Sequence, residues 1–172
     1  GYLRMDFLIP ARGLIGFRNQ FLTDTKGNGI MNHVFAGWGA YKGDIPGRTR
    51  GSLVAFEAGT TTAYGIDKCQ ARGTMYVNPG EEVYEGEIVG ENSREDDMDV
   101  NPCKKKHVSN MRAAGSDDAV RLVPPQTFSL EGALEHINDD ETVEVTPKSI
   151  RMRKKILSRM ERARTRARNA RA

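Results

Sequence analysis

Two kinds of hydrophobic periodicity follow each other in the first 43 residues. Apolar residues alternate with polar ones from Tyr2 to Ile9, which predicts a strand. From Gly13 to Thr25 they recur at helical spacing, and Ile30–Tyr41 predicts a second strand. This order is one βαβ unit, half of a ferredoxin-like module and too small to close its own core. We therefore expect residues 1–43 to be the second half of a domain, with an apolar face that is exposed or covered by a neighbour. That face is expected to include Leu14, Phe17 and Phe21.

A hydrophilic connector, Asp44–Arg50, marks a domain boundary. Beyond it, short β-like runs separated by turns predict a small barrel-like or curled sheet. These runs are Ser52–Ala58, Thr61–Ile66, Gly73–Val77 and Glu87–Gly90.

Further along, Ser129 is placed to cap a helix over Leu130–Ile137, and Thr142–Val145 predicts a strand. Thr146 and Pro147 are typical of the start of a helix, which we expect to run to about Met160. The sequence thus predicts an α+β protein, in which a partial βαβ unit (1–43) precedes a barrel-like domain with two helices (44–160). Residues 161–172 alternate arginine with small residues and are expected to be a disordered basic tail.

Charge is distributed unevenly along the chain. The formal net charge is +3, but the 25 residues from Lys148 onward carry +10 and the remainder −7. A basic end on an acidic body indicates a polyanionic partner, either nucleic acid or an anionic membrane surface. Two cysteines favour free thiols in a reducing cytosol, and no apolar run approaches the ~20 residues that span a bilayer. The sequence therefore predicts a soluble, cytoplasmic protein.

The long polar stretch Asn101–Asp118 lacks helical or alternating periodicity, which predicts a loop. Loops of this length in compact domains are typically functional or disordered. Its basic and hydrogen-bonding side chains suit phosphate oxygens, although a solvated loop without a partner is the alternative. The candidate RNA-binding residues here are Lys104, Lys105, Lys106, His107, Ser109, Asn110 and Arg112. The final predicted helix offers a second phosphate-facing surface, with Lys148, Arg151, Arg153, Lys154 and Lys155.

Signals for catalysis are missing from the sequence. It contains no phosphate-binding GxxxxGK[ST] loop, no CxxC pair, no metal-ligand spacing among its three histidines and no GxSxG elbow. The acidic segment Glu91–Asp99 lacks the glycine turn of a calcium loop, which favours a solvated segment. His33 and His136 are expected to be structural. We expect no enzymatic activity, cofactor or metal in this chain.

Several stretches resemble the BipA (TypA) family of ribosome-associated translational GTPases. IPARGLIGFRNQFLTDTKGNGIMNHVFAGWGAYKG is similar to the second half of the module that corresponds to domain V of elongation factor G. RGSLVAFEAGTTTAYGID, HVSNMRAAGSDDAVRL and VEVTPKSIRMRKKIL resemble the family's own C-terminal domain. The resemblance extends to about Leu157 and does not cover the Arg-Ala tail from about Arg159.

The resemblance implies a function that spacing alone does not. Family members carry a GTPase domain, with its GTP and magnesium, and a β-barrel domain ahead of this segment; both are expected to be missing here. Their C-terminal domain binds the 50S subunit near the peptidyl-transferase centre, where a basic loop reaches 23S rRNA and the acceptor end of A-site tRNA. The matching loop here is Lys104–Asp118. The family acts in stress and cold adaptation and in 50S assembly.

A ribosome-binding module without catalysis is therefore the leading hypothesis. The alternative is a protein-interaction or anionic-surface module that uses the basic tail. Membrane-surface helices need an apolar stripe, and beyond Met160 the tail has none. We therefore expect no membrane partner.

Overall fold

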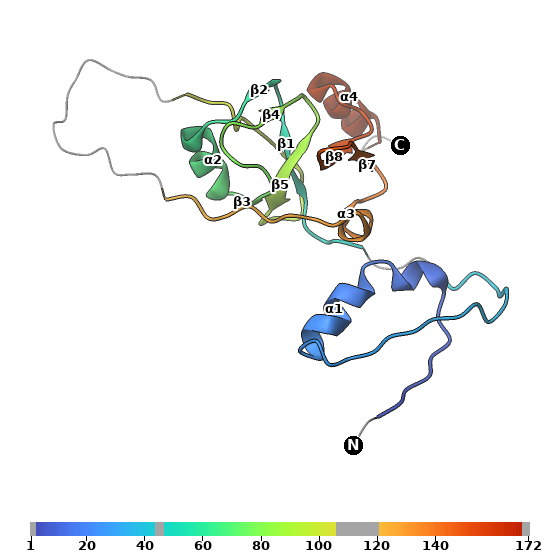
Figure 1. The fold of residues 1–172 in the computed structure, drawn as a ribbon. Coiled ribbons are helices and arrows are strands. Elements are labelled where there is room, and N and C mark those ends of the chain that lie inside the picture. The colour runs from blue at the N-terminus through green and yellow to red at the C-terminus, as the bar shows by residue number, and fades with distance from the viewer. Residues whose placement is uncertain (1–2, 44–46, 106–120, 170–172) are drawn as a thin grey trace, which may run out of the picture.

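The computed structural model describes residues 3–43, 47–105 and 121–169. Its elements form a mixed α+β fold, with an N-terminal region drawn in blue and a sheet-containing domain that follows it (Figure 1). The predicted α+β class is confirmed, whereas the sheets of the described residues do not close into a barrel.

The N-terminal region contains a 3₁₀ turn, η1 (Ala11–Leu14), and the helix α1 (Phe17–Asp24). The predicted helix is thus present in a shorter form. The two predicted strands are wrong, because residues 3–9 and 30–41 are irregular. A strand needs a neighbour to satisfy its backbone donors and acceptors, and the described residues supply none here.

Apolar side chains in this region lack a core of their own. Phe17 is 41% exposed, and several others are more exposed still, among them Leu3, Phe7, Ile30, Phe35 and Trp38. Leu14 and Phe21 are half-buried. An apolar surface of this extent is typical of a contact surface.

The centre of the following domain is a four-stranded sheet in the order β3-β5-β1-β6. β1 (Ser52–Ala55) pairs antiparallel with β5 (Ile88–Asn92) and parallel with β6 (Met98–Val100), and β3 (Gly73–Met75) pairs with the other edge of β5. The predicted strands at β1, β3 and β5 are confirmed with shifted ends.

Both faces of this sheet are covered. On one face Leu53, Met75 and Val89 pack with Ile66 of α2 (Ala63–Gln70). On the other, Ile88 packs with Ala133 and Met152. Because successive side chains of a strand point to opposite faces, β5 contributes to both cores and its first residues form a continuous apolar run.

Helix α2 occupies part of the predicted strand Thr61–Ile66, which is therefore wrong. Thr62 caps the helix, since its Oγ1 accepts a hydrogen bond from the Gly65 amide at 2.9 Å. Ile66 and Cys69 lie three residues apart and are both buried. The same threonines suit a strand or a cap, and burial of this helical stripe favours the cap. A short ladder of β2 (Gly59–Thr60) and β4 (Glu82–Val83) lies beside it.

The segment from Thr146 to about Met160, predicted to be the last helix, contains a strand instead. β7 (Glu141–Val145) and β8 (Ile150–Lys154) form a hairpin in which Thr146 closes the turn. Its amide donates to the Ser149 carbonyl and its Oγ1 accepts from the Ser149 amide, each at 2.9 Å. Thr146 and Pro147, which were expected to start a helix, therefore lie in the turn between two strands.

Two helices flank the hairpin. In α3 (Leu130–His136) the predicted cap is confirmed, since Ser129 Oγ accepts from the Gly132 amide at 3.2 Å. Ala133 is the only fully buried residue of this helix. The segment expected to be a disordered tail forms α4 (Arg159–Asn169). Figure 1 shows α2 on one side of the sheets and α4 on the other.

Candidate nucleic-acid interface

The long basic loop leaves and re-enters the domain beside α2. Thr62 Oγ1 donates to the Lys104 carbonyl at 2.5 Å, and the Thr62 amide donates to the Pro102 carbonyl at 2.9 Å. At the other end of the helix, Gln70 Nε2 donates to the Val123 carbonyl at 2.8 Å, and the Val123 amide donates to Gln70 Oε1 at 3.3 Å. One helix thus holds both stems of the loop.

Close packing fixes the first stem further. A Cβ added at Gly65 would lie 2.1 Å from the Pro102 carbonyl oxygen, so glycine allows α2 to contact the backbone of the stem. Pro102 itself is buried, and Cys103 packs against the core. The first stem is therefore packed against the domain as far as Cys103.

Lys104 and Lys105 are exposed at the end of this stem. The other candidate residues of the loop lie outside the described residues, namely Lys106, His107, Ser109, Asn110 and Arg112. Thr62 and Gln70 were not identified from the sequence, because their partners lie 42 and 53 positions away. Threonine is a common helix cap, so a cap at Thr62 could have been predicted. No nearby residue identifies Gln70 as part of the site.

Replacing Gln70 by Ala should release the second stem. One hydrogen bond contributes about 1 kcal/mol, so the Val123 amide should exchange with solvent about five times faster. Hydrogen exchange measured by NMR checks this. Gln70→Glu, which keeps the acceptor, should show a smaller effect, and Gln126→Ala, at an exposed position on the same stem, should show none. Equal Val123 exchange rates in Gln70→Ala and the unmodified chain would contradict the clamp.

The second predicted basic surface is not formed as expected. It presumed a helix, whereas its residues lie on and beside β8, where alternate side chains face opposite ways. Arg151 is 3.7 Å from Glu87 and Arg153 is 3.3 Å from Glu144, so both already face carboxyl groups of the chain itself. Lys155 donates to the Asp139 carbonyl, and Lys148 is exposed in the turn.

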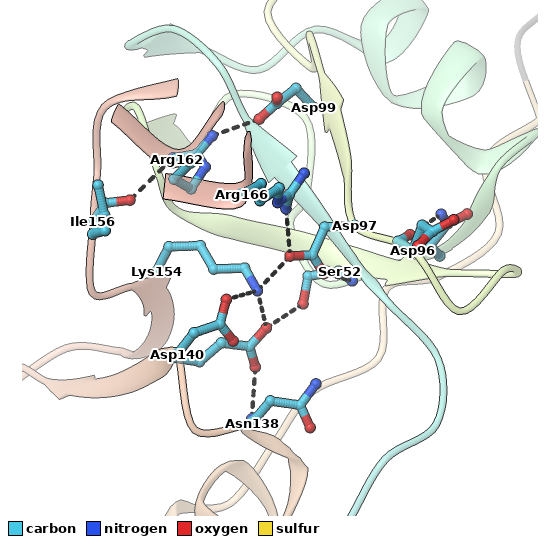
Figure 2. Close-up of polar contacts among 12 residues, drawn as sticks. Ser52, Asp96, Asp97, Asp99, Asn138, Asp140, Lys154, Ile156, Arg162 and Arg166 are labelled. Carbon is cyan, nitrogen blue, oxygen red and sulfur yellow. Dashed lines mark hydrogen bonds and ion pairs between the residues drawn. The ribbon is translucent and has the colours of Figure 1, made fainter. Parts of the chain in front are cut away.

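Lys154 is a buried structural group. Only 2% of its side chain is exposed, and Nζ lies 2.7 Å from Asp97, 2.9 Å from Asp140 and 2.8 Å from Glu141 (Figure 2). With three carboxylates around it, Lys154 cannot face a phosphate, and its assignment to the RNA-binding surface is wrong.

The charges of this cluster stabilise one another. Burial alone would raise the pKa of Glu141, but hydrogen bonds from Lys154 and Ser52 outweigh it and hold the pKa below its ordinary value. For Asp97, burial is likewise outweighed by the hydrogen bond from Lys154, and the pKa is lowered. Burial would lower the pKa of Lys154, but its carboxylate partners raise it. Each group is therefore charged at neutral pH.

Arg48 extends the cluster to the connector before β1. Its Nη2 donates to Glu141 at 2.9 Å and to Ser52 Oγ at 2.8 Å, and its Nη1 faces His136 Nε2 at 2.9 Å. Burial, followed by the charge of Arg48, lowers the pKa of His136 to about 4, so the ring is neutral at neutral pH. His136 is thus a structural residue, as expected.

The acidic segment around β6 is also engaged. Asp97 accepts from the Ser52 amide at 2.8 Å and pairs with Lys154, and Asp99 pairs with Arg162 at 2.5 Å. The expectation of a solvated acidic segment is wrong for these two residues. Their partners, Lys154 and Arg162, lie 57 and 63 residues further along the chain, so the local sequence does not reveal them.

Glu87 is buried beside the hairpin, with 3% of its surface exposed. Burial raises its pKa to about 7 from an ordinary 4.5, although Arg151 and the Tyr84 amide oppose the shift. A carboxyl with a raised pKa binds its proton more readily in the folded state. Glu87 therefore lowers stability as pH rises from 4.5 to 7.

The variant Glu87→Gln should accordingly gain stability over the unmodified chain as pH rises through that window. At pH 4.5 the two should be close, and by pH 7 the variant should unfold at higher urea. His136, whose pKa is lowered, acts in the opposite direction, but its contribution cancels in the difference between the two proteins. Urea unfolding across the window measures this difference. If the difference in stability between the two proteins did not change with pH, burial would not raise the pKa of Glu87.

The described residues form neither a cluster of metal ligands nor a membrane-spanning helix. Among those residues no group of three or more His, Cys, Asp or Glu side chains could hold a metal ion. No helix described there has the length and apolar character to cross a membrane. Cys69 and Cys103 are free cysteines, as expected.

Models of known protein families match almost the whole chain. Residues 50–159 match the model of the TypA/BipA C-terminal domain, and residues 1–49 match that of the elongation factor G C-terminus. Proteins named large ribosomal subunit assembly factor BipA are similar in sequence. The Bacillus subtilis protein is 47% identical over 163 residues and the Salmonella typhimurium protein 46% over 165 residues, or 94% and 95% of this chain. The protein from Synechocystis is 46% identical over 154 residues, or 90% of the chain.

The chain spans only 26–27% of the length of these curated relatives. The matched part corresponds to their C-terminal domains and includes no GTPase domain. Since the domain model covers more than half of the chain, this chain belongs to the TypA/BipA family.

Proposed function

We propose that this chain is the ribosome-binding C-terminal region of a BipA-type translational GTPase. The relatives are named assembly factors of the large ribosomal subunit, which supports a role on that subunit and a cytoplasmic location. The chain itself is proposed to be non-catalytic, with GTP and magnesium bound by another domain of the complete protein. Roles in 50S assembly and in stress or cold adaptation are part of the proposal.

The contact element is proposed to be the basic loop, reaching 23S rRNA and the acceptor end of A-site tRNA near the peptidyl-transferase centre. The observation that carries this assignment is the double clamp by α2. Thr62 and Gln70 hold stems from which exposed lysines emerge. A loop whose ends are fixed loses less conformational entropy when it binds. Lysine and arginine supply phosphate contacts, and the neutral residues supply hydrogen bonds or stacking.

Residues 1–43 and 44–160 are proposed to be separate structural units. The exposed apolar side chains of the first unit support this division. On the β8 side, Lys148 remains a candidate phosphate contact because it is exposed. Arg151 and Arg153 could contribute only by exchanging their present carboxylate partners.

Sedimentation with purified ribosomal subunits tests the proposal. The chain should pellet with 50S subunits and not with 30S subunits, and added salt should weaken the association. Deleting residues 106–120 and joining the stems by a short glycine linker should reduce pelleting while the far-UV CD spectrum is retained. Equal pelleting with both subunits, or with neither, would contradict the proposal.

A further inference from the structure

Helix α4 is docked on the domain by one row of arginines. Arg162 is 7% exposed and pairs with Asp99 at 2.5 Å, while its Nη1 donates to the carbonyls of Ile156 and Leu157. Arg166 pairs with Asp97 at 2.9 Å, and Arg159 lies 3.4 Å from Asp99. Figure 2 shows Arg162 pointing to Asp99 of β6 and Arg166 pointing to Asp97, the residue just before that strand. Residues three and four apart share a helix face, so this row is the inner face of α4.

The outer face carries a second pair of arginines. Arg164 and Arg168 follow the inner residues by two positions, which places them on the opposite side of the helix. Both are exposed, and within the part of the chain that the structure describes neither has a carboxylate partner. They are one turn apart, with Cβ atoms about 5–6 Å from each other. Asp97 and Asp99 thus neutralise only the inner row.

Docking gives this outer pair an ordered scaffold. Isolated helices shorter than about 12–15 residues are marginal in water, and α4 has 11 residues. The ion pairs with Asp97 and Asp99 hold it in place, and basic residues in its last turn complement the helix dipole. Ordering has therefore occurred before a partner arrives, which lowers the entropic cost of binding.

The chemistry of the outer face favours RNA over a membrane or a protein. Arginine forms planar, two-pronged hydrogen bonds that match phosphate. A membrane-surface helix requires a row of large apolar residues, and Met160 is the one large apolar side chain in α4. Protein interfaces are typically centred on clusters of aromatic and large apolar residues, and α4 has no aromatic residue and no large apolar residue other than Met160.

We propose that the outer face of α4, through Arg164 and Arg168, binds an RNA phosphate backbone at a second surface of the domain. The inference rests on the proposed function and adds a contact on the side away from α2 and the loop stems (Figure 1). Two surfaces on opposite sides would grip separate RNA segments and fix the orientation of the domain on the subunit.

The test compares two variants of equal charge. Arg164→Gln/Arg168→Gln removes the outer pair, and Lys26→Gln/Lys42→Gln removes two exposed charges of the N-terminal region. Binding to purified 50S subunits is titrated from low to high salt. Loss of two phosphate contacts should reduce the slope of log affinity against log salt by about two and weaken binding about tenfold at low salt. The control should bind as the unmodified chain does, and CD should show unchanged helix content.

Each other outcome overturns a defined part of the account. If the arginine variant binds like the unmodified chain, α4 is not a contact and the proposed function stands. If the control weakens as much as the arginine variant, the effect is net charge alone and the α4 surface is rejected. Loss of binding to phosphatidylserine vesicles with unchanged 50S binding would assign the helix to a membrane instead. Failure of the unmodified chain to bind 50S would overturn the proposed function together with this inference.

Discussion

Replacing Lys154 by Met should lower the free energy of unfolding by about 3–5 kcal/mol, because removing one partner of a buried ion cluster leaves uncompensated charge. Glu141 is fully buried, and Asp97 has only 15% of its side chain exposed. Arg48 and Ser52 would still contact Glu141, but the charge that links Asp97, Asp140 and Glu141 would be gone. Urea unfolding followed by CD at neutral pH measures the loss.

The pH dependence of this variant has a defined sign. Because the pKa values of Asp97 and Glu141 are lowered in the folded chain, their contribution is present above their ordinary values and is lost as pH falls through the folded ones. Without Lys154 these carboxyls should protonate more readily, so the deficit should shrink in acid. Lys148→Met, at an exposed turn position, should change stability by less than about 0.5 kcal/mol. A deficit for Lys154→Met as small as this control would show that the cluster does not stabilise the fold.

The second large effect concerns the loop. Replacing Lys104, Lys105 and Lys106 together by Ala should weaken 50S binding steeply at low salt and much less at high salt. Each lost phosphate contact should reduce the salt slope by about one, and therefore by about three in all. Titration of labelled chain with 50S subunits at several salt concentrations measures both quantities.

Stability should not change in this triple variant, since exposed loop positions contribute under about 0.5 kcal/mol each. The matched control is Arg18→Ala/Lys26→Ala/Lys42→Ala, which removes three exposed basic residues of the N-terminal region. Equal weakening by both triple variants would mean that net charge, and not the loop, determines binding.

Local sequence signals identified elements whose neighbours are close in the chain. Ser129 caps α3 as predicted, and the strand β7, which pairs with the next strand β8, lies where its β-branched residues placed it. These signals depend on contacts within a few residues, such as Ser129 Oγ with the Gly132 amide.

Elements that depend on distant partners could not be predicted in this way. Thr146 and Pro147 suit a helix start, yet pairing of β8 with β7 makes them a hairpin turn. Thr61–Ile66 is rich in β-branched residues, yet Ile66 is buried as part of a helix. In the N-terminal region the alternation is present, but the described residues provide no strand to pair with.

Charge counting had the same limitation at the candidate site. It assigned Lys154 to a phosphate-facing surface because its carboxylate partners lie 13, 14 and 57 residues away in sequence. For the same reason α4 was expected to be disordered, since Asp97 and Asp99 are remote in sequence. The exposed Lys104 and Lys105 needed no such partner, and their exposure agrees with the sequence-based expectation.

The central claim is that the basic loop lies against 23S rRNA near the peptidyl-transferase centre. Hydroxyl-radical cleavage from an iron chelate attached at Lys105→Cys, in a Cys103→Ala background, tests it directly. Cys69 can stay, because burial raises its pKa to about 11 and leaves little reactive thiolate. With 50S subunits, the probe should cleave 23S rRNA strands that line the peptidyl-transferase centre, and a probe at Lys26→Cys should not. Cleavage confined to other regions of the subunit, or no cleavage above that of free chelate, would contradict the account.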